Sequence, residues 1–242
     1  MKLERYYIDD SLAVGQSANL TNEQAKHCRT VMRNKIGDSV VLFNGLGGEF
    51  VAEISTVSKK DIVLNVLEFI NINRIPETEI TLFTAVPKHK RFDFLIEKAT
   101  ELGVNEITPL ITERSSNIAS AFNESNTKRH KTKIIEACKQ SGRNILPVLN
   151  SPRTLESMIS VDADLKIVLH PSTTNFKILN NPSKIKTIAL AVGAEGGFTD
   201  AEVRSFLNNA WQTLTIGKSI LRVETAVIAA LSIVNHLLDE NT

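Results

Sequence analysis

The sequence predicts an α/β protein in two parts, a small β-rich N-terminal domain and a larger α/β domain. In residues 40–69, short apolar runs alternate with turn-forming residues, which is typical of closely connected strands. From residue 80 onward, strand-like runs alternate with helical patterns, as they do in a sheet covered by helices. The polar stretch 71–79, which contains Pro76, separates the two patterns. We therefore expect domains over residues 1–70 and 80–242, joined by a linker over residues 71–79.

The N-terminal domain is expected to fold as a compact barrel. Strands are expected at residues 40–43, 50–57 and 62–69. Residues 45–48 and 59–61 supply the turns between them. A helix that begins at Thr21 or Asn22 and ends at Arg33 is expected to precede the strands. Short strands with close turns favour a barrel.

The α/β domain is expected to contain five strands, at residues 80–85, 107–111, 166–169, 187–192 and 211–216. A helix with one apolar face follows the first strand and ends at Gly103. The last helix, over residues 224–238, has no charged side chain between Glu224 and His236. An ordinary surface helix has a polar face, so we expect this one to be buried on most sides, in the core or against another subunit.

A glycine-rich loop joins the predicted strand 187–192 to a helix. Residues 193–198 read Gly-Ala-Glu-Gly-Gly-Phe, and these glycines leave backbone N–H groups uncovered for a ligand. Thr199 and Glu202 have the spacing of a capping box, so the helix should begin directly after the loop. The loop matches neither standard phosphate-binding fingerprint. On its own, it could be a tight turn or a ligand site.

Three strand ends carry candidate ligand-binding residues. His170, Gly193 and Gly217 each follow a predicted strand. If the sheet is parallel, all three lie on the same rim, where α/β sheets bind their ligands. We expect His170 to form part of the pocket wall.

Composition narrows the class of protein. The formal net charge is +1, so any RNA contact must come from local basic patches. Cys28 and Cys138 are too few for a disulfide framework or a metal cluster, which suits a reducing cytosol. The N-terminus has no apolar signal core, and no apolar stretch approaches the ~20 residues of a spanning helix. We therefore expect a soluble cytoplasmic protein.

Two segments near the C-terminus resemble signature segments of the SPOUT methyltransferases. They are residues 193–198 and the run Ile-Gly-Lys-Ser-Ile-Leu-Arg-Val-Glu-Thr-Ala at residues 216–226. The chain is most similar to the ribosomal RNA small subunit methyltransferase E family, which methylates N3 of a uridine in 16S rRNA. Further similar segments, at residues 27–37, 90–104 and 136–143, extend the resemblance over essentially the whole chain. One departure is Ala194, where the family pattern has proline.

The resemblance implies a PUA-like RNA-binding β-barrel at the N-terminus and a SPOUT α/β domain with a trefoil knot. It also implies S-adenosyl-L-methionine as the cofactor, no metal, a homodimer, and 16S rRNA in the assembled small ribosomal subunit as the substrate. The residues alone would not predict a knot, because knotted chains are rare. Two alternatives stay open. One is a SPOUT enzyme that acts on transfer RNA or on a ribose 2′-OH, and the other is a non-enzymatic RNA-binding or ribosome-assembly protein.

The implied active site has cofactor contacts and catalytic groups. The cofactor contacts are expected to be Leu169, His170, Pro171, Gly193, Glu195, Gly196, Gly197, Ile216, Gly217, Ile220, Leu221 and Thr225. Uracil N3 must lose a proton before or during attack, and either Glu195 or Glu224 could act as the base. Arg222 could stabilise the charge that develops on the uracil oxygens.

Basic side chains are the candidate RNA contacts. They are Arg5, Lys26, Arg29, Arg33, Lys88, Lys90, Arg91, Arg114, Lys131 and Arg143. The alternative for each is an ordinary solvated charge. Salt dependence of RNA binding separates the two, because a phosphate contact releases counterions.

Overall fold

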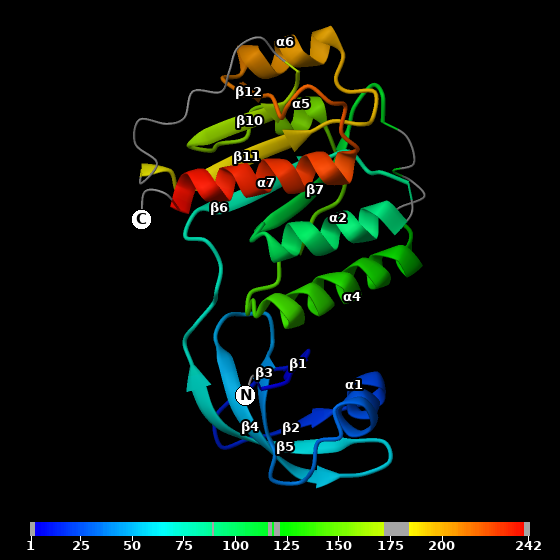
Figure 1. Cartoon of the computed structure of the whole chain (residues 1–242), viewed down its shortest axis with the longest axis vertical. Coiled ribbons are helices and arrows are strands. Elements are labelled where there is room, and N and C mark those ends of the chain that lie inside the picture. Colours follow the sequence, from blue (N-terminus) through cyan, green and yellow to red (C-terminus); the bar gives the residue numbers. More distant parts are fainter. Residues whose placement is uncertain (1–2, 89, 116–117, 119–121, 172–183, 240–242) are drawn as a thin grey trace. The chain divides into compact units, whose positions relative to one another are not determined.

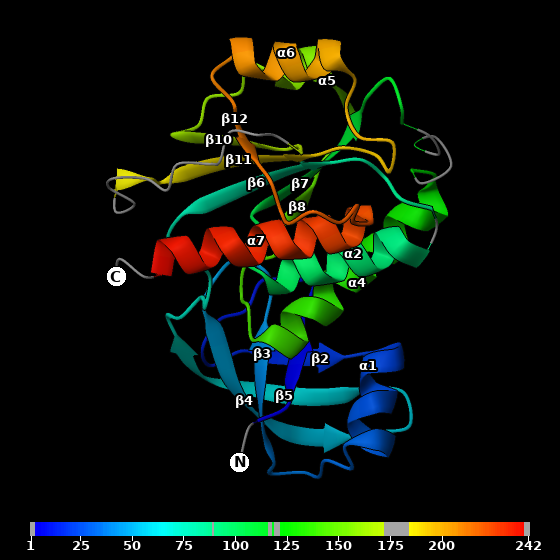
Figure 2. The ribbon, with the colours of Figure 1, turned by 45° about the horizontal axis from the view of Figure 1, so that its top comes forward.

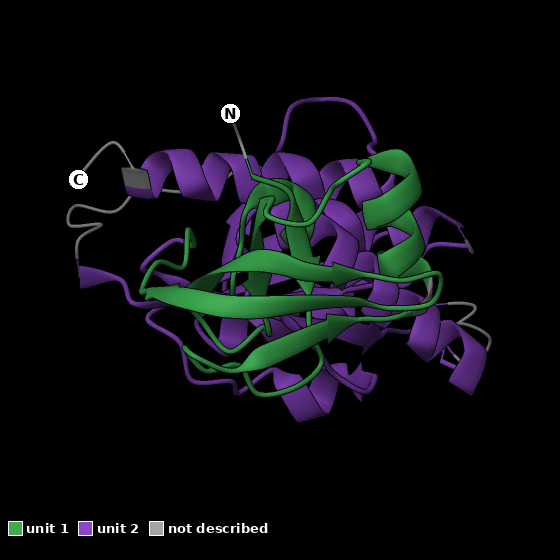
Figure 3. Cartoon of the chain, turned by 90° about the horizontal axis from the view of Figure 1, so that it is seen from below, with its two compact units in different colours: residues 1–75, 138–146 green, residues 76–137, 147–242 purple. Residues whose placement is uncertain are grey.

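The computed structural model describes residues 3–88, 90–115, 118, 122–171 and 184–239 (Figure 1). The chain forms two compact units, which Figure 3 colours separately. Unit 1 comprises residues 1–75 and 138–146, and unit 2 comprises residues 76–137 and 147–242. The first boundary falls within the predicted linker. Residues 138–146 belong to unit 1, whereas the sequence pattern placed them in the α/β domain.

Unit 1 is built on a five-stranded sheet. Its strands are β1 (Arg5–Tyr7), β2 (Ser17–Leu20), β3 (Ser39–Phe43), β4 (Glu49–Val57) and β5 (Ile62–Ile70), in the order β1-β3-β4-β5-β2. The pairs are antiparallel, except that β1 runs parallel to β3. The register between β4 and β5 shifts at two places, and such bulges bend a strand. The three predicted strands are confirmed, whereas closure of the sheet into a barrel stays a prediction.

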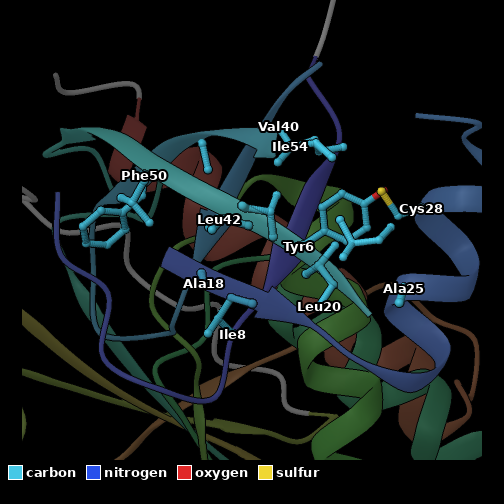
Figure 4. Packing of buried hydrophobic residues seen from close by; sticks show 14 residues of the cluster. Tyr6, Ile8, Ala18, Leu20, Ala25, Cys28, Val40, Leu42, Phe50 and Ile54 are labelled. Atoms are coloured by element: carbon cyan, nitrogen blue, oxygen red, sulfur yellow. The ribbon is translucent and has the colours of Figure 1, made fainter. Parts of the chain in front are cut away.

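The core of unit 1 covers one face of this sheet (Figure 4). Alternate residues of the strands point into it, including Tyr6, Leu20, Leu42, Ile54 and Leu64. Helix α1 (Asn22–Lys26) adds Ala25, and its continuation, the π-helix η1 (His27–Val31), adds Cys28. The helical stretch ends at Val31, before the predicted end. Arg33 adopts a φ of 56°, a left-handed conformation that cannot continue a right-handed helix.

A buried ion-pair cluster holds residues 138–146 in unit 1. The Glu49 side chain is only 7% exposed and lies 2.5 Å from Arg5 Nη1 and 2.6 Å from Arg74 Nη1. Arg5 also donates to Asn144 Oδ1 and to the carbonyl oxygen of Arg143. The hydrogen bonds from Arg74, Arg5 and Asn144, with that of Arg74 the largest effect, lower the pKa of Glu49 to about 2 against the opposing effect of burial.

This cluster corrects two of the expected RNA contacts. Arg5 is 7% exposed and Arg143 is 2% exposed. Arg143 Nε donates to the carbonyl oxygen of Ile145, within its own segment. Both guanidinium groups are buried inside unit 1, so neither is available at the surface for a phosphate.

Unit 2 contains a parallel sheet. Its strands are β6 (Glu79–Thr84), β7 (Glu106–Ile111), β8 (Val148–Leu149), β9 (Arg153–Thr154), β10 (Leu165–Leu169), β11 (Thr187–Val192) and β12 (Gln212–Leu214). The order is β12-β10-β11-β6-β7-β8, and β9 pairs with β7. Every pair is parallel. The five predicted strands are confirmed, although β12 is shorter than expected.

Helices cover both faces of the unit 2 sheet (Figure 2). Helices α2 (Lys90–Glu101) and α7 (Val223–Asp239) pack together on one face, and α5 (Leu155–Met158) and α6 (Asp200–Asn208) lie on the other. Ala189 and Ala191 of β11 point into a cluster with Phe206 and Trp211. These small side chains leave room for the aromatic rings. The remaining long helix, α4 (Glu124–Ser141), contains the second boundary between the units.

Helix α7 is buried on one face only within this chain. Val227, Ala230 and Leu231 are fully buried, whereas Thr225 and Ser232 are exposed. The expected burial on most sides is therefore not reached by this chain alone. Although α7 is rich in apolar residues, neither it nor any other helix in the described ranges is long and apolar enough to cross a membrane.

Candidate active site

A cavity of about 570 Å³ opens at the carboxyl edge of the parallel sheet in unit 2. The segments that follow the adjacent strands β12, β10 and β11 line it, together with Arg114, Val223 and Ala226. The N–H of His170 donates to the carbonyl oxygen of Leu214 at 3.2 Å, which joins the ends of β10 and β12. The prediction that the three strand ends share one rim is confirmed.

The glycine loop, residues 193–198, is fixed at its C-terminal end. Phe198 is 4% exposed and packs edge-on against Phe206, with ring centroids 5.0 Å apart. The N–H of Thr199 donates to Glu202 Oε2 at 2.8 Å, and the N–H of Glu202 donates to Thr199 Oγ1 at 3.3 Å. This reciprocal pair confirms the predicted capping box. The loop therefore ends at a defined point while its glycines line the cavity.

Arg114 holds the middle of the glycine loop. Its Nη1 donates to the carbonyl oxygen of Gly196 at 2.5 Å and to that of Phe198 at 3.4 Å. A Cβ atom added at Gly196 would lie 3.2 Å from Arg114 Cδ, so the arginine stem runs close to the loop backbone. Arg114 also lines the cavity. Arg114 is one of the predicted RNA contacts. Its contact with the glycine loop has no local signal in the sequence, because 82 residues separate Arg114 from Gly196.

A second arginine pairs with the loop at Glu195. Arg91 Nη1, at the start of α2, lies 2.6 Å from Glu195 Oε1. The two side chains are 33% and 58% exposed, so solvent screens the pair and it is worth at most about 1 kcal/mol. Glu195 also lines the cavity. Its carboxylate is thus held at the cavity by a weak, solvent-accessible contact.

The expected site residues fall into two groups. Every expected cofactor contact lines the cavity except Thr225, which the structure places outside the described lining. Of the expected catalytic residues, Glu195 lines the cavity, whereas Arg222 and Glu224 are not among the described lining residues. Arg222 is exposed. Glu224 is 7% exposed, and its Oε2 has no hydrogen-bond partner in the described part of the chain.

The remaining candidate RNA contacts lie at the surface. Exposed side chains among them are Lys26, Arg33, Lys88, Lys90 and Lys131. Arg29 is half-buried, and its Nη1 donates to the carbonyl oxygens of Ser58 and Lys59. Arg29 therefore joins two segments of unit 1.

The cavity suits a small organic ligand with polar edges. Leu169, Ile216 and Leu221 provide apolar walls, and the glycine loop provides exposed backbone. A volume of about 570 Å³ lies within the range of small-molecule sites. Gly197 and Gly217 have φ values of 69° and 67°, a conformation that other residues adopt only with strain. Over the described ranges, no group of three or more His, Cys, Asp or Glu side chains could hold a metal.

Comparisons with known proteins identify the family. Residues 74–235 match the RNA methyltransferase domain, and residues 20–67 match the RNA methyltransferase PUA domain. Ribosomal RNA small subunit methyltransferase E of Buchnera aphidicola is 34% identical over 96% of this chain and 92% of its own length. The corresponding protein of Rickettsia conorii is 32% identical over 98% of this chain and 97% of its own. The chain belongs to the ribosomal RNA small subunit methyltransferase E family.

Solved structures of similar proteins share the fold of this ribosomal RNA small subunit methyltransferase E family member. A methyltransferase of Legionella pneumophila, solved in complex with the cofactor SAM, is 33% identical, covers 98% of both chains and gives a TM-score of 0.85. Ribosomal RNA small subunit methyltransferase E of Neisseria gonorrhoeae, bound to S-adenosyl methionine, is 28% identical over 97% of this chain and 98% of its own, with a TM-score of 0.86. The predicted α/β fold with an N-terminal PUA-like domain is confirmed.

Proposed function

We propose that this protein transfers the methyl group of S-adenosyl-L-methionine to N3 of a decoding-region uridine in 16S rRNA, on the small ribosomal subunit. The observation that carries the proposal is the cavity, in which the glycine loop and residues 214–221 line one space at the sheet edge. Two proteins of similar fold were solved with this cofactor bound. Relatives that match almost the whole chain bear the name of a small-subunit ribosomal RNA methyltransferase.

The expected cofactor contacts that line the cavity would hold S-adenosylmethionine. When bound, this cofactor supplies an electrophilic methyl group. Apolar walls such as Leu169 and Ile216 remove the ligand from water, and the glycines at 193 and 196 let backbone N–H groups approach it. Arg114 holds the loop in place before binding, so less conformational entropy is lost when the ligand arrives. The fixed loop also helps to keep the methyl group in line with the nucleophile.

The chain must also remove the proton from uracil N3. Glu195 lines the cavity, so we propose it as the base in preference to Glu224. The carboxylate of Glu195 can accept the proton if its contact with Arg91 loosens, and that contact is exposed and weak. Arg222 follows the lining residue Leu221 and is exposed, so it can reach a substrate outside the cavity. We propose that it stabilises the charge on the uracil oxygens.

We further propose a homodimer, and a trefoil knot in unit 2. The dimer has support from Ile220, which lines the cavity with 94% of its surface exposed. A partner subunit at this edge would cover this side chain. The knot has its support in the family resemblance. A ribosomal RNA substrate also implies that the protein acts in the cytoplasm.

Methyl transfer from labelled S-adenosylmethionine tests the function. Three substrates are compared: small ribosomal subunits that lack the modification, naked 16S rRNA, and bulk transfer RNA. Label that appears as 3-methyluridine with small subunits supports the proposal. Label in transfer RNA or on ribose would keep the enzyme and overturn the substrate. No transfer and no cofactor binding by calorimetry would leave a non-enzymatic RNA-binding protein.

A pair of arginine variants tests the catalytic role. Arg222→Gln should lower the rate of transfer at saturating substrate about 100-fold and leave cofactor affinity unchanged, as expected for loss of a charge-stabilising group. Arg204→Gln is the matched control, because Arg204 is an exposed arginine of α6 outside the described lining. Equal rates for the two variants would remove Arg222 from the mechanism.

A further inference from the structure

An exposed apolar tip begins at the last residue of the π-helix of unit 1. We define the tip as residues 31–36. Its side chains Val31, Met32 and Ile36 are 63%, 41% and 66% exposed. Three large apolar side chains exposed within six residues are unusual for a surface with no partner, and such patches mark interaction sites.

Positive charge surrounds the tip. Lys26, Arg29, Arg33 and Lys35 lie within the same stretch, and no Asp or Glu occurs from residue 24 to residue 37. The side chains of Lys26, Arg33 and Lys35 are exposed. Since the formal net charge of the whole chain is only +1, this is a local concentration of positive charge.

The fold adds two more lysines to this surface. Arg29 Nη1 donates to the carbonyl oxygens of Ser58 at 2.7 Å and Lys59 at 2.5 Å. These bonds hold the turn between β4 and β5 beside η1, and the turn carries the exposed side chains of Lys59, Lys60 and Asp61, so it adds net positive charge. The acidic residue that follows the tip, Asp38, has its carboxylate turned to the backbone, where it accepts from the N–H of Lys35 at 2.7 Å.

The tip is held in a defined conformation. The N–H of Gly37 donates to the carbonyl oxygen of Ile54 at 2.8 Å, and the N–H of Ile54 donates to that of Asp38 at 3.0 Å. The tip is therefore anchored to β4. A π-helix precedes it, and Arg33 within it has a φ of 56°. Both features are uncommon, and both are found more often at functional sites than elsewhere.

We propose that this surface binds unpaired nucleotides of RNA, with the apolar tip packed against bases and the flanking lysines and arginines on phosphates. Phosphate contacts need only the positive charges, so they do not account for the apolar side chains. In RNA, side chains pack on base faces that are unstacked in loops and bulges, whereas an A-form double helix keeps these faces stacked. A partner protein with an apolar surface would not call for the surrounding positive charge. The inference rests on the proposed action on RNA, but not on catalysis.

Binding of labelled RNA to the full chain tests this inference. A stem-loop and a fully paired duplex of equal length are titrated at several salt concentrations. The double variant Val31→Gln and Ile36→Gln should lose about tenfold in affinity for the stem-loop, since two aliphatic side chains no longer pack on bases. Its affinity for the duplex and the slope of log K against log salt should stay unchanged, because the lysines and arginines still neutralise the same phosphates.

Matched variants separate the apolar part of the surface from the charged part. The double variant Val14→Gln and Leu67→Gln removes two apolar side chains of unit 1 that are 55% and 51% exposed, and it should bind both RNAs normally. Lys59→Gln with Lys60→Gln should flatten the salt slope by about 0.7 for each phosphate of a single strand that is no longer neutralised. The inference would be overturned if the tip variant lost equal affinity for the stem-loop and the duplex, or if it lost no affinity for either RNA. These readouts involve no methyl transfer, so they stand or fall independently of the enzymatic proposal.

Discussion

The substitution Glu49→Gln should lower the free energy of unfolding of unit 1, and it should do so only at a pH where Glu49 is charged in the wild type. The pKa of Glu49 falls from an ordinary 4.5 to about 2 in the folded protein, chiefly through the hydrogen bond from Arg74. That difference corresponds to about 3 kcal/mol of folding free energy. The side chain is 7% exposed, so solvent screens the effect little. Breaking a buried ion pair by removing one partner has a cost of about the same size, 3–5 kcal/mol.

The sign of the pH dependence follows from the lowered pKa. The stabilisation is fully present above the unfolded pKa of 4.5 and is lost as the pH falls toward the folded pKa of about 2. The difference in unfolding free energy between wild type and variant should therefore be about 3 kcal/mol at neutral pH and smaller by about 1.4 kcal/mol at about pH 3.5. The variant itself should show a correspondingly weaker dependence on acid.

Intrinsic probes separate the two units in this assay. Both tyrosines, Tyr6 and Tyr7, lie in unit 1, and the one tryptophan, Trp211, lies in unit 2. In urea unfolding followed by tyrosine circular dichroism, Glu49→Gln should lower the urea concentration at the midpoint. Glu53→Gln changes an exposed residue of β4 and should leave this midpoint unchanged. A wild-type-to-variant difference that is the same at pH 7 and at about pH 3.5 would refute the assigned role of the ion-pair cluster.

Three further outcomes test the loop, the cap and the cysteines. Gly196→Ala should weaken cofactor binding about fivefold, as measured by calorimetry. The reason is that the added Cβ would lie 3.2 Å from Arg114 Cδ. If the losses from Gly196→Ala and Arg114→Ala simply add in the double variant, this cause is wrong. Thr199→Ala should destabilise unit 2 by about 1 kcal/mol in Trp211-monitored unfolding, whereas Thr154→Ala should cost less, since the Thr154 side chain makes no capping bond in the described helix α5. Cys28 and Cys138 are buried, and burial raises the pKa of Cys28 and raises the pKa of Cys138 to about 11. A thiol reagent at mildly alkaline pH should therefore label the two cysteines only as fast as the protein unfolds.

The sequence predicted those parts of the fold that have a local pattern. The continuous apolar run of β11 predicted its bounds, because a strand covered on both faces has no polar side to interrupt it. The edge strands β1 and β2 and the short β8 and β9 carry only two to four residues each, too few for a period. Their conformation depends on pairing with distant partners. The helical stretch ends early, at Val31, because Arg33 adopts a left-handed conformation that the local sequence pattern did not predict.

The same limit applies to the candidate site. The glycine loop and the strand ends are local motifs, and the cavity forms where they meet. The positions of the arginines were harder to predict, because the fate of a charged side chain depends on where its partner lies in the folded chain. Arg5 is buried because Glu49 and Asn144 meet it, at separations of 44 and 139 residues. Arg114 holds the loop because Gly196 is brought to it, and neither pairing leaves a trace in the neighbouring sequence.

The return of residues 138–146 to unit 1 affects how the protein matures during synthesis. A nascent chain emerges N-terminus first, and contiguous domains can fold as they appear. Here β1 to β5 are made early, yet Asn144, which pairs with Arg5 and Glu49, is made after β6, α2, β7 and the whole of α4. Unit 2 in turn lacks β12 and α7 until almost the end of translation. Neither unit can be completed before synthesis of the other has begun, so the two units mature as interdependent parts of one chain.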